Sequence, residues 1–134
     1  MIERSNLNIS TIETYLNSII DNVVSKNTFF TALPDASIIQ SSDWQDMVLI
    51  DIPDGIKDFD AYGQGHVLIC LYARPLESGR KNVAKMSELE TKLNEVINIA
   101  SNKDYLIVRN DVHTTFDDDI NWHCNVVEVL ITIV

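Results

Sequence analysis

The segment from His66 to Arg74 constrains the fold most, because it is apolar on both sides of an extended chain. Alternate side chains of a strand point to opposite faces of its sheet. One face of this strand would carry Val67, Ile69, Leu71 and Ala73, and the other would carry Leu68, Cys70 and Tyr72. Such a strand needs cover on both faces. We therefore expect a central strand that ends at Pro75.

Two amphipathic segments are typical of helices that cover a sheet. The first runs from about Thr11 to Val24, where apolar residues recur at helical spacing: Ile12, Tyr15, Leu16, Ile19, Ile20, Val23 and Val24. Ser10 and Glu13 have the spacing of a capping box, which predicts that Ser10 is the N-cap residue of this helix. The second runs from about Asn82 to Ala100, with a stripe of Met86, Leu89, Leu93, Val96, Ile97 and Ala100.

The remaining elements are predicted from β-branched runs and turn residues. Further strands are expected at Met47–Ile52, Tyr105–Val108 and Trp122–Val134. Residues 27–46 fit either a short strand or an irregular segment. Loops are expected at Asp54–Gly63 and Asp111–Asn121, and Gly63-Gln64-Gly65 resembles a hairpin turn with positive φ.

This order of elements predicts an α+β domain. Strands that follow one another without an intervening helix pair antiparallel, so we expect a mainly antiparallel sheet of four to five strands with two helices packed on one face. A length of 134 residues suits one domain over residues 1–134. The predicted core, taken from the apolar stripes, contains Leu16, Ile20, Leu71, Leu93, Ile97, Val129 and Ile131.

Composition limits the partners and the compartment. A formal net charge of −10 disfavours non-specific binding to nucleic acid, because that binding needs cations to neutralise phosphates. The start Met1-Ile2-Glu3-Arg4 lacks the apolar stretch of an export signal, and the apolar run Val126–Val134 is too short to span a bilayer. Cys70 and Cys124 lie within apolar runs, as buried thiols of a reducing cytoplasm do.

Catalytic and metal-binding patterns in the sequence are weak. Pro53-Asp54 with Glu90-Thr91-Lys92 resembles a nuclease signature, but the second group falls within a predicted helix. His113, His123 and Cys124 match no zinc spacing, and His123 and Cys124 would point to opposite faces of one strand. We therefore expect no enzyme activity, no cofactor and no metal.

Charge is distributed unevenly along the chain. Acids dominate from Asp35 to Asp60, whereas the segment Arg74–Lys85 is basic. Cations at a helix start are disfavoured by the helix dipole, by about 0.3–1 kcal/mol each, so we interpret them as interface residues. The candidate interface set is Arg74, Arg80, Lys81, Lys85, Asp54, Asp58, Asp117, Asp118 and Asp119. The alternative is an ordinary charged surface.

The layout of the chain after Asn8 resembles the tail-terminator or tail-completion proteins of tailed bacteriophages. The features that match are the two amphipathic helices, the terminal strand and the strand end Leu71-Tyr72-Ala73-Arg74-Pro75. The resemblance implies a virion structural protein without catalytic residues, made in the host cytoplasm. It would form a homo-oligomeric ring, often a hexamer, that caps the tail tube and joins it to the neck.

The resemblance also implies partners. The ring would contact tail-tube and neck or connector proteins through the Asp54–Gly63 and Asp117–Asp119 loops, and DNA would pass through a lumen whose negative charge repels phosphate. A different class remains open: a small acidic binding protein, such as an immunity or antitoxin-like inhibitor of a basic toxin, for which opposite charge speeds association.

The two cysteines give a direct test of burial. Both thiols should react slowly with a thiol reagent in the native protein and rapidly in denaturant, because apolar strand residues flank them. Immediate labelling of both thiols in the native protein would contradict this expectation.

Overall fold

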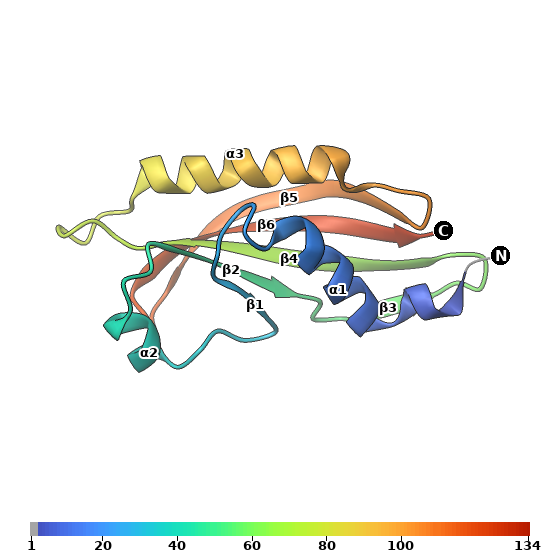
Figure 1. Ribbon diagram of the computed structural model, residues 1–134, viewed down its shortest axis with the longest axis horizontal. Coiled ribbons are helices and arrows are strands. Elements are labelled where there is room, and N and C mark those ends of the chain that lie inside the picture. The colour runs from blue at the N-terminus through green and yellow to red at the C-terminus, as the bar shows by residue number, and fades with distance from the viewer. Residues whose placement is uncertain (1–2) are drawn as a thin grey trace.

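The strand β4 (Gly63–Ala73) lies at the centre of a six-stranded sheet in the computed structural model, which describes residues 3–134 (Figure 1). The strand order is β1-β2-β4-β6-β5, and β3 pairs with the first part of β4. All neighbouring strands are antiparallel except β1 and β2, which are parallel. The other strands are β1 Thr28–Phe30, β2 Asp46–Asp51, β3 Ile56–Asp58, β5 Tyr105–Asp117 and β6 Trp122–Ile133.

Two helices cover one face of the sheet, as predicted. They are α1 (Ile9–Ile20) and α3 (Val83–Ala100), and a 3-10 turn at Arg4–Leu7 precedes α1. Their apolar stripes pack against the helix-facing residues of β2, β4 and β6 in one buried cluster, and this burial is the main stabilising term. Of the seven predicted core residues, all are buried except Ile97, which is partly buried. The α+β class is confirmed, but the sheet has six strands where four to five were predicted, and there are three α-helices where two were predicted.

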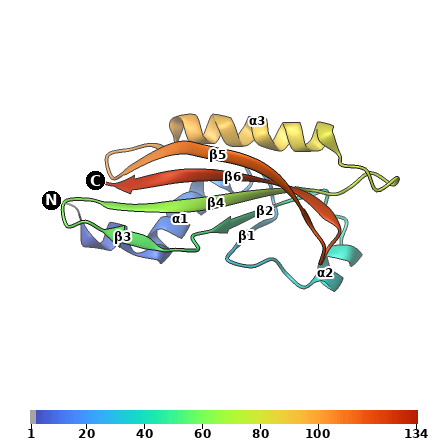
Figure 2. The ribbon, with the colours of Figure 1, turned by 180° about the vertical axis from the view of Figure 1, so that it is seen from behind.

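The opposite face of the sheet is covered only at one end. There the short helix α2 (Ala36–Ser41) packs with the strand residues Met47, Cys70, Tyr72, Trp122 and Cys124. Seen from behind, α2 lies at one end of the sheet and the rest of that face has no helix over it (Figure 2). The segment 27–46, left open by the sequence, therefore supplies both the edge strand β1 and a third helix.

The strand β5 is longer than predicted. It was expected to end at Val108 and continues to Asp117, paired with β6 along this length and interrupted by a bulge between Arg109 and Asp111. Polar residues occupy its second half because this half is exposed, so no apolar alternation marks it. The predicted polar connection from Asp111 to Asn121 is therefore wrong over most of its length.

The glycines Gly63 and Gly65 form part of β4, and the predicted turn is wrong. Neither has positive φ; the positive φ values near them belong to Gly55 (66°) and Asp60 (71°). A Cβ on Gly63 would overlap the side chain of Leu7, and one on Gly65 would lie 2.8 Å from the carbonyl oxygen of Gly55. These glycines permit close approach, and they let β3 form within the predicted loop.

The start of α3 agrees with the prediction, whereas the start of α1 does not. Asn82 caps α3, because its side chain accepts a hydrogen bond from the Lys85 backbone N–H at 3.1 Å. The helix α1 starts at Ile9, two residues before the predicted Thr11, with Asn8 as its N-cap residue, and it ends at Ile20, before the predicted Val24. Ser10 is therefore inside the first turn, and the predicted capping box does not form.

The shared core can be tested at Leu93, which is buried beneath α3. Leu93→Ala should lower the free energy of unfolding by ~2–5 kcal/mol, because it leaves a cavity between α3 and the sheet. Urea denaturation measures the change, and the exposed α3 residue Ile99, replaced by alanine, is the matched control. Equal effects of the two substitutions would show that the α3 stripe is not core.

Candidate interaction surfaces

The outer edge of β5 is uncovered along most of the strand. Every residue from Val108 to Phe116 is exposed. Four exposed side chains of the strand are apolar: Leu106, Val108, Val112 and Phe116. An edge strand presents a row of unpaired backbone N–H and C=O groups, which proteins usually guard with lysine, proline or a bulge. β5 contains neither lysine nor proline, but it has a bulge with the exposed charged residues Arg109 and Asp111 on either side of it.

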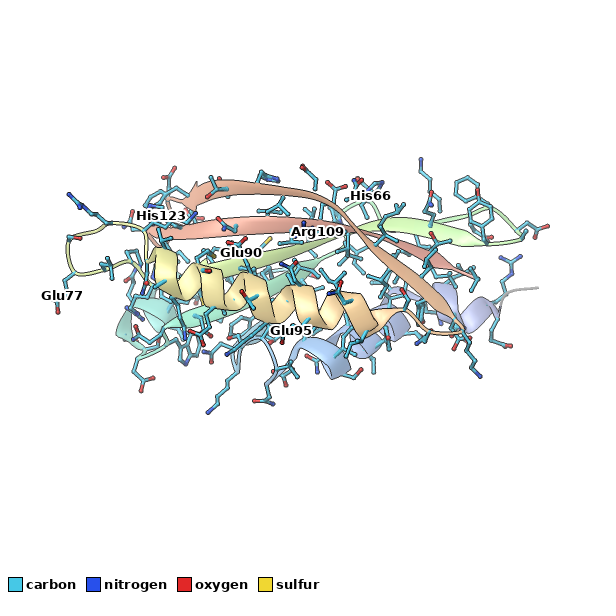
Figure 3. The ribbon with its side chains drawn as sticks, turned by 90° about the horizontal axis from the view of Figure 1, so that it is seen from above. His66, Glu77, Glu90, Glu95, Arg109 and His123 are labelled. Atoms are coloured by element: carbon cyan, nitrogen blue, oxygen red, sulfur yellow. The ribbon has the colours of Figure 1, made fainter. Side chains whose placement is uncertain are left out.

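Two loops mark the opposite ends of the long axis (Figure 1). One is the turn between β3 and β4, and the other connects β4 to α3. Figure 3 places Glu77 at the tip of the second loop, far from His66 on β4. The acidic segment around Asp58 and the basic segment around Arg80 are therefore separated by the length of the molecule.

The turn between β3 and β4 is held in one shape by charge. Arg4 donates hydrogen bonds to the carboxylates of Asp58 and Asp60, the second at 2.8 Å. The hydrogen bond from Arg4 holds the pKa of Asp58 below its usual value. At the tip, the rings of Phe59 and Tyr62 stack with centroids 4.9 Å apart, although they are 46% and 40% exposed.

Arg74, a predicted interface residue, is used inside the fold. Its guanidinium donates to the carbonyl oxygens of Trp44 (2.6 Å), Ile39 (3.1 Å) and Ser42 (3.2 Å). It also lies 4.8 Å from the centroid of the Trp122 ring. Arg74 thus ties α2 and the loop after it to the end of the sheet.

Lys81, a second predicted interface cation, points back onto the sheet. Its Nζ donates to Asn125 Oδ1 at 2.9 Å and to Thr114 Oγ1 at 3.1 Å. Asn125 is a buried polar residue, and its amide donates to Glu90 at 2.7 Å. This network connects the start of α3 to β5 and β6, and it satisfies a polar group that would be costly to bury alone.

Lys85 is also paired within the chain. Its Nζ lies 3.0 Å from the carboxylate of Asp46, and this hydrogen bond raises the pKa of Lys85. The pair borders an open hollow of about 520 Å³ that is also lined by Lys26, Lys92 and Asp43. Among the four predicted interface cations of the described chain, Arg80 alone has a side chain that forms no ion pair or hydrogen bond with another residue; its backbone N–H donates to Ser78 Oγ.

The three aspartates of the β5–β6 connection do not act as one group. Asp117 is partly buried, and it accepts hydrogen bonds from the Tyr72 hydroxyl (3.4 Å) and the Asp119 backbone N–H (3.0 Å). Burial is the largest cause that raises the pKa of Tyr72, and nearby acidic groups raise it further. Asp118 and Asp119 are exposed, as is Asp54 at the far end of the molecule.

The histidines and cysteines of residues 3–134 do not form a metal-ligand cluster. Within this range no three His, Cys, Asp or Glu side chains converge as metal ligands. His123 packs edge-on against Phe116 on the helix-facing side of the sheet, and Cys124 lies on the other side near Cys70. Cys70 and Cys124 are both buried free thiols, and the neighbouring Cys70 thiol, together with burial, raises the pKa of Cys124.

Comparison with known proteins gives no relative: no protein-family model matches the chain, and no curated protein is similar to it. In the described part of the chain, none of the helices has the length and apolar character needed to cross a membrane.

The internal role of Arg74 separates it from Arg80. Arg74→Ala should lower the free energy of unfolding by about 2 kcal/mol or more, because it leaves several carbonyl groups without their charged donor. Arg80→Ala should change it by less than about 0.5 kcal/mol, since Arg80 is exposed. Urea denaturation of both variants checks this, and similar losses would contradict the assignment of Arg74 to the fold.

Proposed function

We propose that this chain is a structural subunit that assembles with copies of itself into a ring, at the head–tail junction of a tailed bacteriophage. The bare edge of β5 is the observation that carries the proposal. Backbone groups and four apolar side chains are exposed there over most of one long strand. Covering such an edge by an adjoining subunit satisfies its hydrogen bonds and buries its apolar residues.

The distribution of charge supports the same proposal. A closed ring with a single type of contact uses two different patches on each subunit. The turn after Asp58 and the loop that carries Arg80 lie at opposite ends of the molecule, so these two groups do not pair within one chain, although Lys85 and Asp46 do (Figure 1). A net charge of −10 also suits a ring through which DNA slides without binding.

A second candidate function is favoured by the same net charge: a small acidic protein that binds and inhibits a basic protein. Three of the four predicted interface cations are engaged internally, which leaves a surface dominated by exposed carboxylates such as Asp54 and Asp118. This candidate predicts a one-to-one complex with a basic partner and a monomer in its absence.

Size-exclusion chromatography with light scattering tests the proposal. The purified chain, alone or with tail-tube protein, should form a closed assembly with the mass of a small whole number of subunits. Val112→Lys together with Phe116→Lys should weaken the assembly, because two charges would be buried against the covered edge. Ile99→Lys is the matched control, since Ile99 is an exposed apolar residue on α3.

Two outcomes would overturn the proposal. One is a chain that stays monomeric at all concentrations and with tail-tube protein. The other is an assembly that the β5 variant and the α3 control change equally.

A further inference from the structure

We propose that a hollow between the start of α2 and the end of β5 binds an organic ammonium ion, a ligand with an apolar body and one positively charged amino group. The hollow has a volume of about 520 Å³ and lies on the face of the sheet away from α1 and α3. Its polar side chains are Tyr72, Asp117 and Asp119, and its other side chains are apolar. The inference goes beyond the proposed ring and does not depend on it.

The apolar side chains of the hollow suit the body of such a ligand. Leu33, Pro34, Leu49 and Ile120 line it, and the first three are only partly buried, so they keep apolar surface that a ligand would cover. A volume of this size is typical of small-molecule sites, which are mostly apolar and contain a few polar groups that orient the ligand. Covering the exposed apolar surface with an alkyl chain favours binding.

The wall that carries Leu33 is held in place without a ligand. The chain turns sharply at Thr31, whose φ of 68° is uncommon for a β-branched residue. The Ala32 backbone N–H closes this turn by donating to Phe30 O at 2.7 Å. The Thr31 N–H donates to Ile50 O at 2.9 Å, which ties the turn to β2. A wall fixed in this way loses little conformational entropy when a ligand binds.

Tyr72 supplies a buried hydroxyl that lacks a close partner. The residue is only 6% exposed, and within residues 3–134 the hydroxyl has one hydrogen-bond partner, Asp117 Oδ2 at 3.4 Å. Hydroxyl hydrogen bonds are usually about 2.7–2.8 Å long, so this one is weak. Burial raises the pKa of Tyr72, which keeps the hydroxyl protonated. A protonated hydroxyl donates to a carboxylate and accepts from an ammonium N–H at the same time.

The charge of the hollow selects a cation. Asp117 is partly buried and Asp119 is exposed, and no lysine, arginine or histidine of residues 3–134 lines the hollow. Arg74, the cation at this end of the sheet, is engaged by carbonyl groups at the other end of α2. An ammonium ion would form charge-assisted hydrogen bonds with the carboxylates, whereas an anion would be repelled. A free alkylamine and the side chain of a lysine both present this group.

Titration with n-hexylammonium, followed by methyl NMR spectroscopy of the leucine and isoleucine side chains, tests the site. The ion should shift the signals of Leu33 and Ile120 in a saturable way, with a Kd in the millimolar range or tighter. n-Hexanol and n-hexanoate have the same alkyl chain without the positive charge. Both should bind at least about tenfold more weakly, because they cannot form charge-assisted hydrogen bonds with the carboxylates.

Two conservative variants separate the polar groups from the apolar walls. Asp117→Asn keeps an oxygen that accepts from the Asp119 backbone N–H, and it should weaken n-hexylammonium binding at least about tenfold while n-hexanol binding is unchanged. Tyr72→Phe should weaken n-hexylammonium binding several-fold, and it keeps the site testable if Asp117→Asn does not fold. Asp118→Asn is the matched control, since Asp118 is exposed and does not line the hollow.

The blocked lysine Nα-acetyl-lysine N-methylamide distinguishes the two sources of the amino group. Tighter binding of the blocked lysine than of n-hexylammonium assigns the site to a lysine side chain of another protein, and weaker binding assigns it to a free amine. The site is overturned if n-hexylammonium gives no saturable shift, or if n-hexanol and n-hexanoate bind as well as n-hexylammonium. It is also overturned if neither Asp117→Asn nor Tyr72→Phe weakens binding more than Asp118→Asn does.

Discussion

The fold depends on burying β4 from both sides. Its residues alternate between a face covered by α1 and α3 and a face covered by α2, Trp122 and the cysteines. A strand with apolar side chains on both faces cannot lie at the edge of a sheet or face water, so β2 and β6 must flank it and helices must cover it. The chain is short. Once it has covered β4, it leaves part of the second face and the edge of β5 exposed.

Arg74 holds α2 and its following loop against the end of the sheet. It closes the chain around the end of β4 by donating to three carbonyl groups of α2 and its following loop. The end of a short helix leaves backbone carbonyls without partners inside the helix, and Arg74 supplies donors to them, in addition to Ser42, which donates to Ile39 O. Arg74 therefore holds α2 over the end of the second face, and the rest of that face has no helix over it (Figure 2).

The elements with strong local patterns were predictable from the sequence. The stripes of α1 and α3 and the two-sided β4 follow from side-chain periodicity, which is a local property. The second half of β5 was missed because an exposed edge strand needs no apolar alternation, and α2 was missed because its six residues bury mainly Ile39. The roles of Arg74 and Lys81 depend on partners 30 to 44 residues away, so no local pattern reports them.

The bulge in β5 affects how the edge of this strand can pair with another strand. Before the bulge, Leu106 and Val108 lie opposite β6 residues of the face away from α1 and α3; after it, Val112 and Phe116 lie opposite residues of the helix-covered face. A regular incoming strand keeps strict alternation, so it can match the side chains on one side of the bulge only. A regular strand of another copy is therefore a poor match for this edge, which disfavours amyloid-like stacking of copies.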